Sequence, residues 1–342
     1  FGSSNIFRHN VWRECPVRWA ASCGPGSTET NPLCLPEEVF RARSSPATAS
    51  GPSDPHEPVL YYSHWVDMGL PENHRFPIDK YRVVTLTLKA EGRARCEPGP
   101  LATLDEACTV HDRQYVKGIL SGNMSIKERK RVGFAEAPVR SYVLRSLASL
   151  GATVAAVRHS LSRNTWSGAL SGGTHHAFAN AGEGFCVFND VAVAAKLAQK
   201  EFHVGTVLIL DLDVHQGNGS AKIFEDDPSV VTVSVHQGKG YPFSTRCRSD
   251  VDVDLPDCCD DQSYMNALRF LPDLLDEVKP EVIIYQAGVD GLAGDRFGRF
   301  SLTREGLMAR NQLVYGLAKE RGLPVIATMG GGYHKDIRKT IQ

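Results

Sequence analysis

The chain has 342 residues, of which 42% are hydrophobic and 23% are charged, and its formal net charge is −1 at pH 7. This composition is typical of a soluble globular protein with a sizeable core. The near-neutral charge excludes a general basic surface for nucleic acid, and because no apolar run approaches about 18 residues we expect no transmembrane helix.

Residues 1–57 are predicted to be a flexible N-terminal extension. They contain five arginines, no lysine, many Ser, Pro and Thr residues and little hydrophobic periodicity, a composition that does not favour a packed layer. Arg- and Ser-rich leaders also serve as organellar transit peptides, but this one carries six acidic residues, which such peptides avoid. The compartment, whether nucleus, cytoplasm, plastid or mitochondrion, stays open. The nine scattered cysteines, with no Cys-x-x-Cys pair, indicate only that it is reducing.

Residues 58–342 are predicted to form one domain in which short apolar runs alternate with helical patterns. The alternation predicts an α/β fold with a single open, mainly parallel sheet and helices on both faces. The clearest elements are strands at 204–210, 230–235, 282–286 and 324–329 and helices at 190–200, 262–278 and 304–321. The basic stretch 127–131 is interpreted as a solvated helix face. Because the chain begins at Phe1 rather than a methionine and ends soon after the last expected strand, we expect a fragment at both ends, with the catalytic domain truncated at its C-terminus.

Two adjacent histidines lie in a glycine-rich segment. Gly172-Gly173-Thr174-His175-His176 precedes Gly184-Phe185-Cys186, and a glycine-rich loop can turn both imidazoles toward one point. Two imidazoles that titrate near neutral pH suit general base and general acid catalysis beside a metal. A histidine pair alone is more often a surface or metal-scavenging feature, so its weight depends on the motifs that follow.

Two carboxylates and an imidazole follow the expected strand 204–210. Asp211, Asp213 and His215 alternate along the chain, so their side chains project to one side of a strand. The carboxyl ends of strands are where open α/β sheets build their sites. A carboxylate and an imidazole suit Zn²⁺, and Asp290, after the strand 282–286, can supply a third ligand. Taken singly, each motif would be interpreted as a polar turn.

The last expected strand runs into Gly330-Gly331-Gly332-Tyr333. Three glycines allow the backbone to approach a site closely, and the phenol can donate a hydrogen bond to a developing oxyanion. By itself this turn is a weak indication of function.

These four segments, in this order, resemble those of the zinc-dependent histone deacetylases, which have the arginase/deacetylase fold. The resemblance runs from about Tyr61 to Tyr333 and includes PENHRFP at 71–77 and AGDRFG at 293–298. The segments GGTHHAFANAGEGFCVFND and AGVDGLAGDRFGR are most similar to class IV enzymes and to bacterial deacetylase-like proteins. The resemblance implies a deacetylase catalytic domain over residues 58–342.

The resemblance also implies a role for each candidate residue. It places zinc on Asp213, His215 and Asp290, the tandem acid/base pair at His175 and His176, and the group that polarises the substrate carbonyl at Tyr333. Asp211 would orient His175, and Asn218 would lie behind His176. Class I enzymes have Asp at the latter position, so the neutral Asn218 should lower the pKa of His176. Gln216 departs from the usual His without a consequence that we can derive.

Substrate and potassium sites are implied in the same way. Gly184, Phe185 and Tyr241 would contact the acyl-lysine in a narrow tunnel, and Asp211 and Ser234 would bind a monovalent cation, K⁺.

The implied reaction is zinc-dependent removal of an acetyl or other acyl group from the lysine side chains of histones or other proteins, without direct contact to nucleic acid or membrane. The metal and Tyr333 would polarise the acyl carbonyl while the histidine pair activates water. One alternative is the same chemistry on an acetylated polyamine or another small amide. A manganese ureohydrolase such as arginase is disfavoured because the additional Asp-rich clusters are absent from the sequence. A catalytically weak interaction module is disfavoured because every expected catalytic position is occupied.

Overall fold

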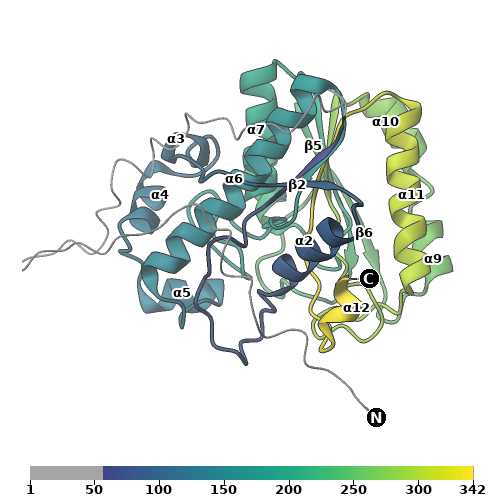
Figure 1. Ribbon diagram of the computed structural model, residues 1–342. Helices are drawn as coiled ribbons and strands as arrows, with labels where there is room; N and C mark the ends of the chain where they lie inside the picture. The colour runs from purple at the N-terminus through teal and green to yellow at the C-terminus, as the bar shows by residue number, and fades with distance from the viewer. Residues whose placement is uncertain (1–56, 342) are drawn as a thin grey trace, which may run out of the picture.

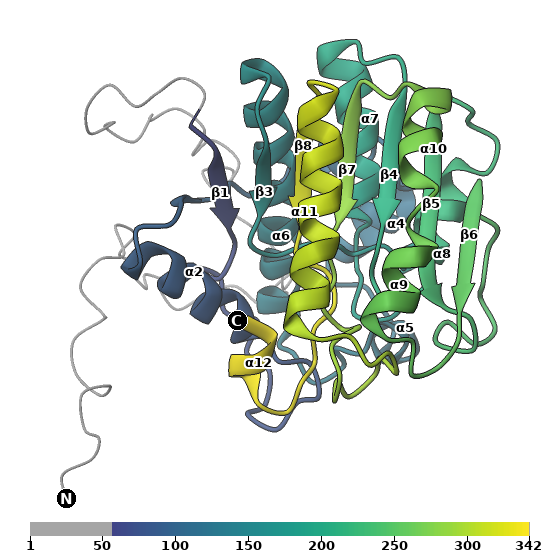
Figure 2. The same cartoon turned by 90° about the vertical axis from the view of Figure 1, so that its right-hand side faces the viewer.

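The computed structural model describes residues 57–341, so nearly all of the predicted N-terminal extension lies outside the described residues. Within the described range, eight strands form one parallel sheet with the order β2-β1-β3-β8-β7-β4-β5-β6. The strands are β1 Val59–Tyr62, β2 Arg95–Pro98, β3 Ser167–Ala169, β4 Val207–Asp211, β5 Val230–Gln237, β6 Val251–Leu255, β7 Val282–Gln286 and β8 Val325–Thr328. Figure 2 shows most of this order from β1 to β6.

The two central strands explain why the sheet is covered on both faces. Every residue of β4 (VLILD) and β7 (VIIYQ) is buried, as expected for parallel strands enclosed by helices. Along β4, Leu208 and Leu210 pack into one apolar cluster, whereas Val207 and Ile209 pack into another on the opposite face. The alternation follows from the two-residue period of a strand.

Helices lie on both sides of the sheet (Figures 1 and 2). On one side are α9 Asp261–Ala267, α10 Leu271–Val278 and α11 Arg304–Glu320, and on the other are α6 Val139–Arg163 and α7 Asp190–Phe202, with α3 Leu104–Ala107, α4 Arg113–Leu120 and α5 Ile126–Val132 beyond them. The remaining helices are α2 Lys80–Ala90, α8 Asn218–Phe224 and α12 Ile337–Ile341. The predicted fold class, a single open parallel sheet between helical layers, is confirmed.

One predicted helix is wrong. The stretch 262–278 forms two helices, α9 and α10, because Pro272 lies in the first turn of α10. In a continuous helix, Pro272 would lack its backbone donor and its ring would clash with the carbonyl of Leu268. The strand expected from 204 begins at Val207 instead, since His203 ends α7 in a left-handed conformation and the next residues form the connection.

Helix α6, which has 25 residues, was not among the predicted elements. It packs closely against the segment that follows β2, because a Cβ at Gly151 would lie 1.9 Å from the Pro100 carbonyl oxygen. The basic stretch 127–131 lies on α5, where most of its side chains are exposed, as predicted. Within residues 57–341, no helix is both long and apolar enough to cross a membrane.

Candidate metal centre and active site

All four sequence motifs converge at one edge of the sheet. The histidine loop follows β3, the Asp-rich segment follows β4, Asp290 follows β7 and the glycine-rich turn follows β8. These strands are neighbours in the order β3-β8-β7-β4. The chain runs outward from β4 through β5 to β6 and then returns to form β7 on the other side of β4. Such a reversal of strand order leaves a crevice at the carboxyl ends, where ligands bind in open α/β sheets.

Asp213, His215 and Asp290 form a buried cluster. One donor atom from each lies within 4.8 Å of the others. His215 Nδ1 is 3.0 Å from Asp213 Oδ1 and 3.0 Å from Asp290 Oδ2. Backbone amides hold the carboxylates in place, since Val214 N donates to Asp290 Oδ1 and Gly331 N donates to Asp213 Oδ2.

The donor set of this cluster fits a metal cation. Asp290 Oδ2 is buried, and its polar contact is with His215 Nδ1, at 3.0 Å. Burial, followed by the charge of Asp213, raises the pKa of Asp290 to about 7. Burial would lower the pKa of His215, but Asp290 and Asp213 raise it to about 10. Two buried carboxylates that face each other are costly unless a cation neutralises them.

The glycine-rich turn leaves room for these carboxylates. A Cβ at Gly331 would lie 1.8 Å from Asp290 Oδ2 and 2.8 Å from Asp213 Oδ2. Any side chain at this position would therefore displace the cluster, which explains why glycine is required there.

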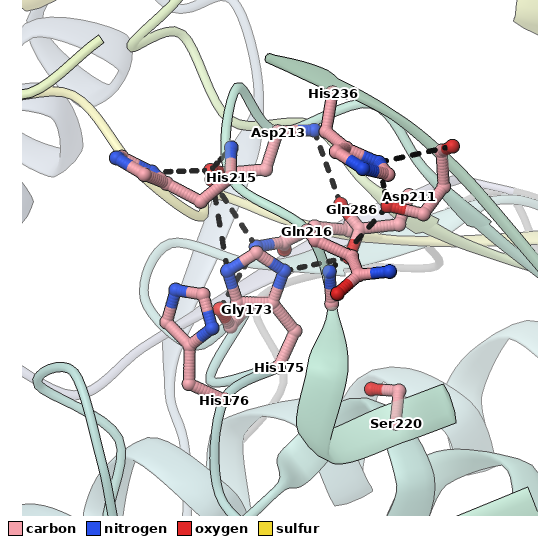
Figure 3. A network of polar contacts seen from close by, with 12 residues as sticks. Gly173, His175, His176, Asp211, Asp213, His215, Gln216, Ser220, His236 and Gln286 are labelled. Carbon is pink, nitrogen blue, oxygen red and sulfur yellow. Dashed lines mark hydrogen bonds and ion pairs between the residues drawn. The ribbon is translucent and has the colours of Figure 1, made fainter. Parts of the chain in front are cut away.

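The adjacent histidines have different partners, and Figure 3 shows that of His175, the carboxylate of Asp211. His175 Nδ1 lies 2.6 Å from Asp211 Oδ2, whereas His176 Nδ1 lies 2.7 Å from Asn218 Oδ1. Burial would lower the pKa of His175, but Asp211 and Asp213 raise it to about 9. Burial, together with the positive charges of His175 and His215, lowers the pKa of His176 well below its ordinary value. Near neutral pH the pair therefore combines one imidazolium with one neutral imidazole.

Tyr333 lies beside the cluster and lines the same pocket as Asp213 and both histidines. Its backbone N–H donates to Asp295 Oδ2 at 2.6 Å, and its ring centroid lies 6.5 Å from that of His215. Burial, followed by the charges of Asp290 and Asp213, raises the pKa of Tyr333 well above its ordinary value. The phenol thus keeps its proton and can donate it in a hydrogen bond to a developing oxyanion.

The predicted substrate contacts surround the histidine pair. Gly184 and Phe185 form a turn with positive φ angles of 56° and 66°, and a Cβ at Gly184 would lie 2.8 Å from His176 Cδ2. The Phe185 ring lies 6.0 Å from the ring of Tyr333, and the Tyr241 ring lies 4.9 Å from that of His176. Of these rings, Phe185 and Tyr333 line one pocket together with both histidines and Asp213.

The two residues predicted to bind a monovalent cation are also neighbours. Ser234 on β5 pairs in register with Asp211 on β4. Ser234 Oγ lies 3.0 Å from His236 Nδ1, and Asp211 uses Oδ1 to accept from Asp213 N. The structure thus brings together every residue that the sequence marked for the site.

Several site residues were not assigned from the sequence. Lys80 is fully buried, and its ammonium donates to the carbonyl oxygens of Gly330 at 2.9 Å and Gly332 at 3.3 Å; burial lowers the pKa of Lys80 to about 8. Gln286 Nε2 donates to the Gly173 carbonyl oxygen at 2.8 Å. A lysine at the start of a helix gives no local signal of burial. Asp295 and Glu183 lie inside the motifs that carried the resemblance but were given no role.

Comparisons with known proteins bear on this geometry. A family model described as Histone deacetylase domain matches residues 74–341. An uncharacterized protein of Picosynechococcus sp. is 39% identical over 292 residues, which cover 83% of this chain and 94% of that protein. Histone deacetylase 2 of Arabidopsis thaliana is 30% identical over 288 residues, which cover 80% and 73%. The crystal structure of the HDA15 HD domain matches with a TM-score of 0.68 at 23% identity, covering 83% of this chain and 86% of that one; at this identity it shows the fold alone.

Proposed function

The chain belongs to the histone deacetylase family, and we propose that it is a zinc-dependent hydrolase that removes acetyl or other acyl groups from lysine side chains of histones or other proteins. The family assignment makes it a deacetylating hydrolase; zinc, the lysine substrate and a role in chromatin regulation are proposals. These proposals rest on one observation: a buried Asp-His-Asp cluster, two histidines and a protonated tyrosine converge at one edge of the sheet.

Asp213, His215 and Asp290 would hold the zinc ion. When bound, zinc polarises the acyl carbonyl and lowers the pKa of water in the site to about 7. We also propose that Asp211 and Ser234 contribute to a potassium site, on the basis of the family resemblance and their pairing across β4 and β5. The similarity to class IV and bacterial enzymes stays a prediction.

The residues of the chain would divide the proton transfers between them. His176, neutral at rest, accepts a proton from the attacking water at Nε2 and later passes it to the leaving amine. His175, paired with Asp211, supplies a positive charge that favours the developing oxyanion. Tyr333 donates a hydrogen bond to the same oxygen. The products are a free amine and a carboxylate.

A set of amide substrates with one chelator control tests the proposal. The set comprises a single lysine peptide prepared in several forms, each with either an acetyl or a longer acyl group on the lysine. It also includes an acetylated polyamine. We expect release of the acyl group from the peptide, loss of activity with the chelator and recovery with added zinc. Hydrolysis of the polyamine but of no peptide would replace the lysine substrate with the small-molecule alternative. A zinc-loaded protein that hydrolyses none of these amides would overturn the proposal.

Replacing Asn218 with Asp should change the pH dependence of catalysis. A carboxylate 2.7 Å from His176 Nδ1 would stabilise the imidazolium and raise its pKa. A base with a higher pKa stays protonated to higher pH, so the acidic limb of the kcat/KM profile should move upward by about 1 pH unit or more. The measurement is a pH–rate profile of both proteins with one acyl-lysine peptide at equal zinc occupancy. An acidic limb that stays in place or moves down would contradict the role of His176 as base.

A further inference from the structure

Glu183 lies behind the histidine pair, on the side of Asn218 that faces away from His176. The Glu183 side chain is only 7% exposed. Its Oε1 accepts hydrogen bonds from Asn218 Nδ2 at 3.3 Å and from the Thr245 hydroxyl. Its Oε2 accepts from Arg131 Nε at 3.0 Å and Nη2 at 2.6 Å. A continuous series of polar contacts thus links His176 to Arg131 on α5.

These contacts determine which way the Asn218 amide points. Asn218 Nδ2 donates to Glu183 Oε1, to the Thr245 carbonyl oxygen at 2.9 Å and to Thr245 Oγ1 at 3.2 Å. With the NH₂ group facing these acceptors, Oδ1 faces His176. A flipped amide would place its carbonyl oxygen against the Glu183 carboxylate and the Thr245 carbonyl oxygen, which are both acceptors. Only the Thr245 hydroxyl could donate to it, and only by giving up its hydrogen bond to Glu183.

The orientation of the amide in turn determines the tautomer of His176. An acceptor 2.7 Å from Nδ1 requires that Nδ1 carry the proton, so Nε2 keeps its lone pair. If the amide were flipped, its NH₂ group would face Nδ1 and favour the opposite tautomer. A base that must take a proton at Nε2 depends on the first arrangement.

Glu183 is ionised in this position. Burial would raise the pKa of Glu183, but the hydrogen bonds from Thr245 and Arg131 outweigh burial and lower it. Its negative charge therefore attracts the Asn218 NH₂ group without touching the imidazole. This arrangement differs from a carboxylate placed directly behind the histidine, which would form an ion pair with it.

We propose that Glu183 is a positioning residue for His176 that acts through Asn218, holding the amide so that His176 stays in the Nδ1-protonated tautomer. The importance of this tautomer for catalysis rests on the proposed function. The assignment of the tautomer itself rests only on the hydrogen bonds of Asn218.

A purely structural role for Glu183 must be separated from this one. The backbone of Glu183 pairs with Cys186 across the turn that carries Phe185, so a substitution can also disturb the fold. Glu106 offers a matched control: its side chain is likewise 7% exposed and forms an ion pair, at 2.8 Å, with Arg158. Glu106 caps α3, on a helix that carries none of the site residues.

The first test compares kinetics of the zinc-loaded enzyme in Glu183→Ala, Glu183→Gln and Glu106→Ala, with thermal unfolding as the measure of stability. We expect Glu183→Ala to lower kcat by at least about tenfold at unchanged KM, as for loss of a group that orients a catalytic histidine. Glu183→Gln should recover most of the loss, because its amide oxygen can still accept from Asn218. Glu106→Ala should lower the unfolding temperature and leave kcat unchanged.

A double variant tests directly whether the effect of Glu183 on kcat depends on Asn218. If Glu183 acts through Asn218, Glu183→Ala should have no further effect on kcat in an Asn218→Ala background. Full additivity of the two losses, or a rise in KM at unchanged kcat, would overturn the proposal.

A spectroscopic measurement keeps the inference independent of activity. In protein labelled with ¹⁵N-histidine and loaded with zinc, His176 should show the Nδ1-protonated tautomer, and Glu183→Ala should shift it toward a mixture. An unchanged tautomer in Glu183→Ala would refute the positioning role. If the wild-type protein hydrolyses no acyl substrate, the proposed function fails and the tautomer measurement alone decides the role of Glu183.

Discussion

Replacing Asp290 with Ala is expected to empty the metal site and reduce amide hydrolysis to the background rate. Asp290 is one of three clustered donors, and its Oδ2 has no other hydrogen-bond partner. A catalytic zinc site usually has three protein ligands, so the variant would keep only Asp213 and His215. Measurement of bound zinc together with turnover of an acyl-lysine peptide checks both effects.

The control for this variant is Asp276→Ala. The Asp276 side chain is 67% exposed and pairs with Arg321 on the protein surface, so its removal should change neither zinc content nor turnover. Stoichiometric zinc with normal turnover in the Asp290 variant would remove Asp290 from the metal site.

Tyr333→Phe is expected to lower kcat by about 10²-fold or more, the cost of losing one oxyanion donor, while bound zinc stays unchanged. The substitution removes only the hydroxyl: the aromatic packing on Phe297, 4.9 Å between ring centroids, and the backbone hydrogen bond to Asp295 do not depend on it. Because the hydrogen bond forms mainly in the transition state, KM should change little. Steady-state kinetics at measured zinc occupancy test this expectation.

Tyr315→Phe provides the comparison for Tyr333→Phe. Tyr315 lies on α11, and its ring packs on Trp166 and Tyr285, away from the histidine pair. We expect normal kinetics in this variant. Equal kcat for the wild type and Tyr333→Phe would show that the phenol does not act on the carbonyl.

Much of the site was predictable because its residues occupy short, local motifs. Asp211, Asp213 and His215 follow directly on a continuous apolar strand, and the alternation of side chains along a strand is a local property. Asp290 follows β7, whose five buried residues form the same kind of run. Each motif taken singly would indicate only a polar turn, so it was the occurrence of all four motifs in this order that identified the family.

The order of strands in the sheet was decided by tertiary structure. No local pattern indicates that β3, β8, β7 and β4 are neighbours, yet this order alone brings the four motifs to one crevice. The break between α9 and α10, in contrast, could have been predicted locally. Pro272 marks the start of a new helix, although the apolar spacing of the whole run is helical.

The residues that support the site depend on contacts between distant parts of the chain. Lys80 reaches the Gly330 carbonyl across 250 positions, and Glu183 reaches Asn218 across 35. A lysine or a glutamate has the same appearance in a sequence whether it is solvated or enclosed, because burial is a property of packed elements rather than of a residue and its neighbours. The sequence by itself therefore determined the fold class and the chemistry-bearing side chains. Packing decided that the buried Glu183 lies against Asn218, and with that which nitrogen of His176 is free to act as a base.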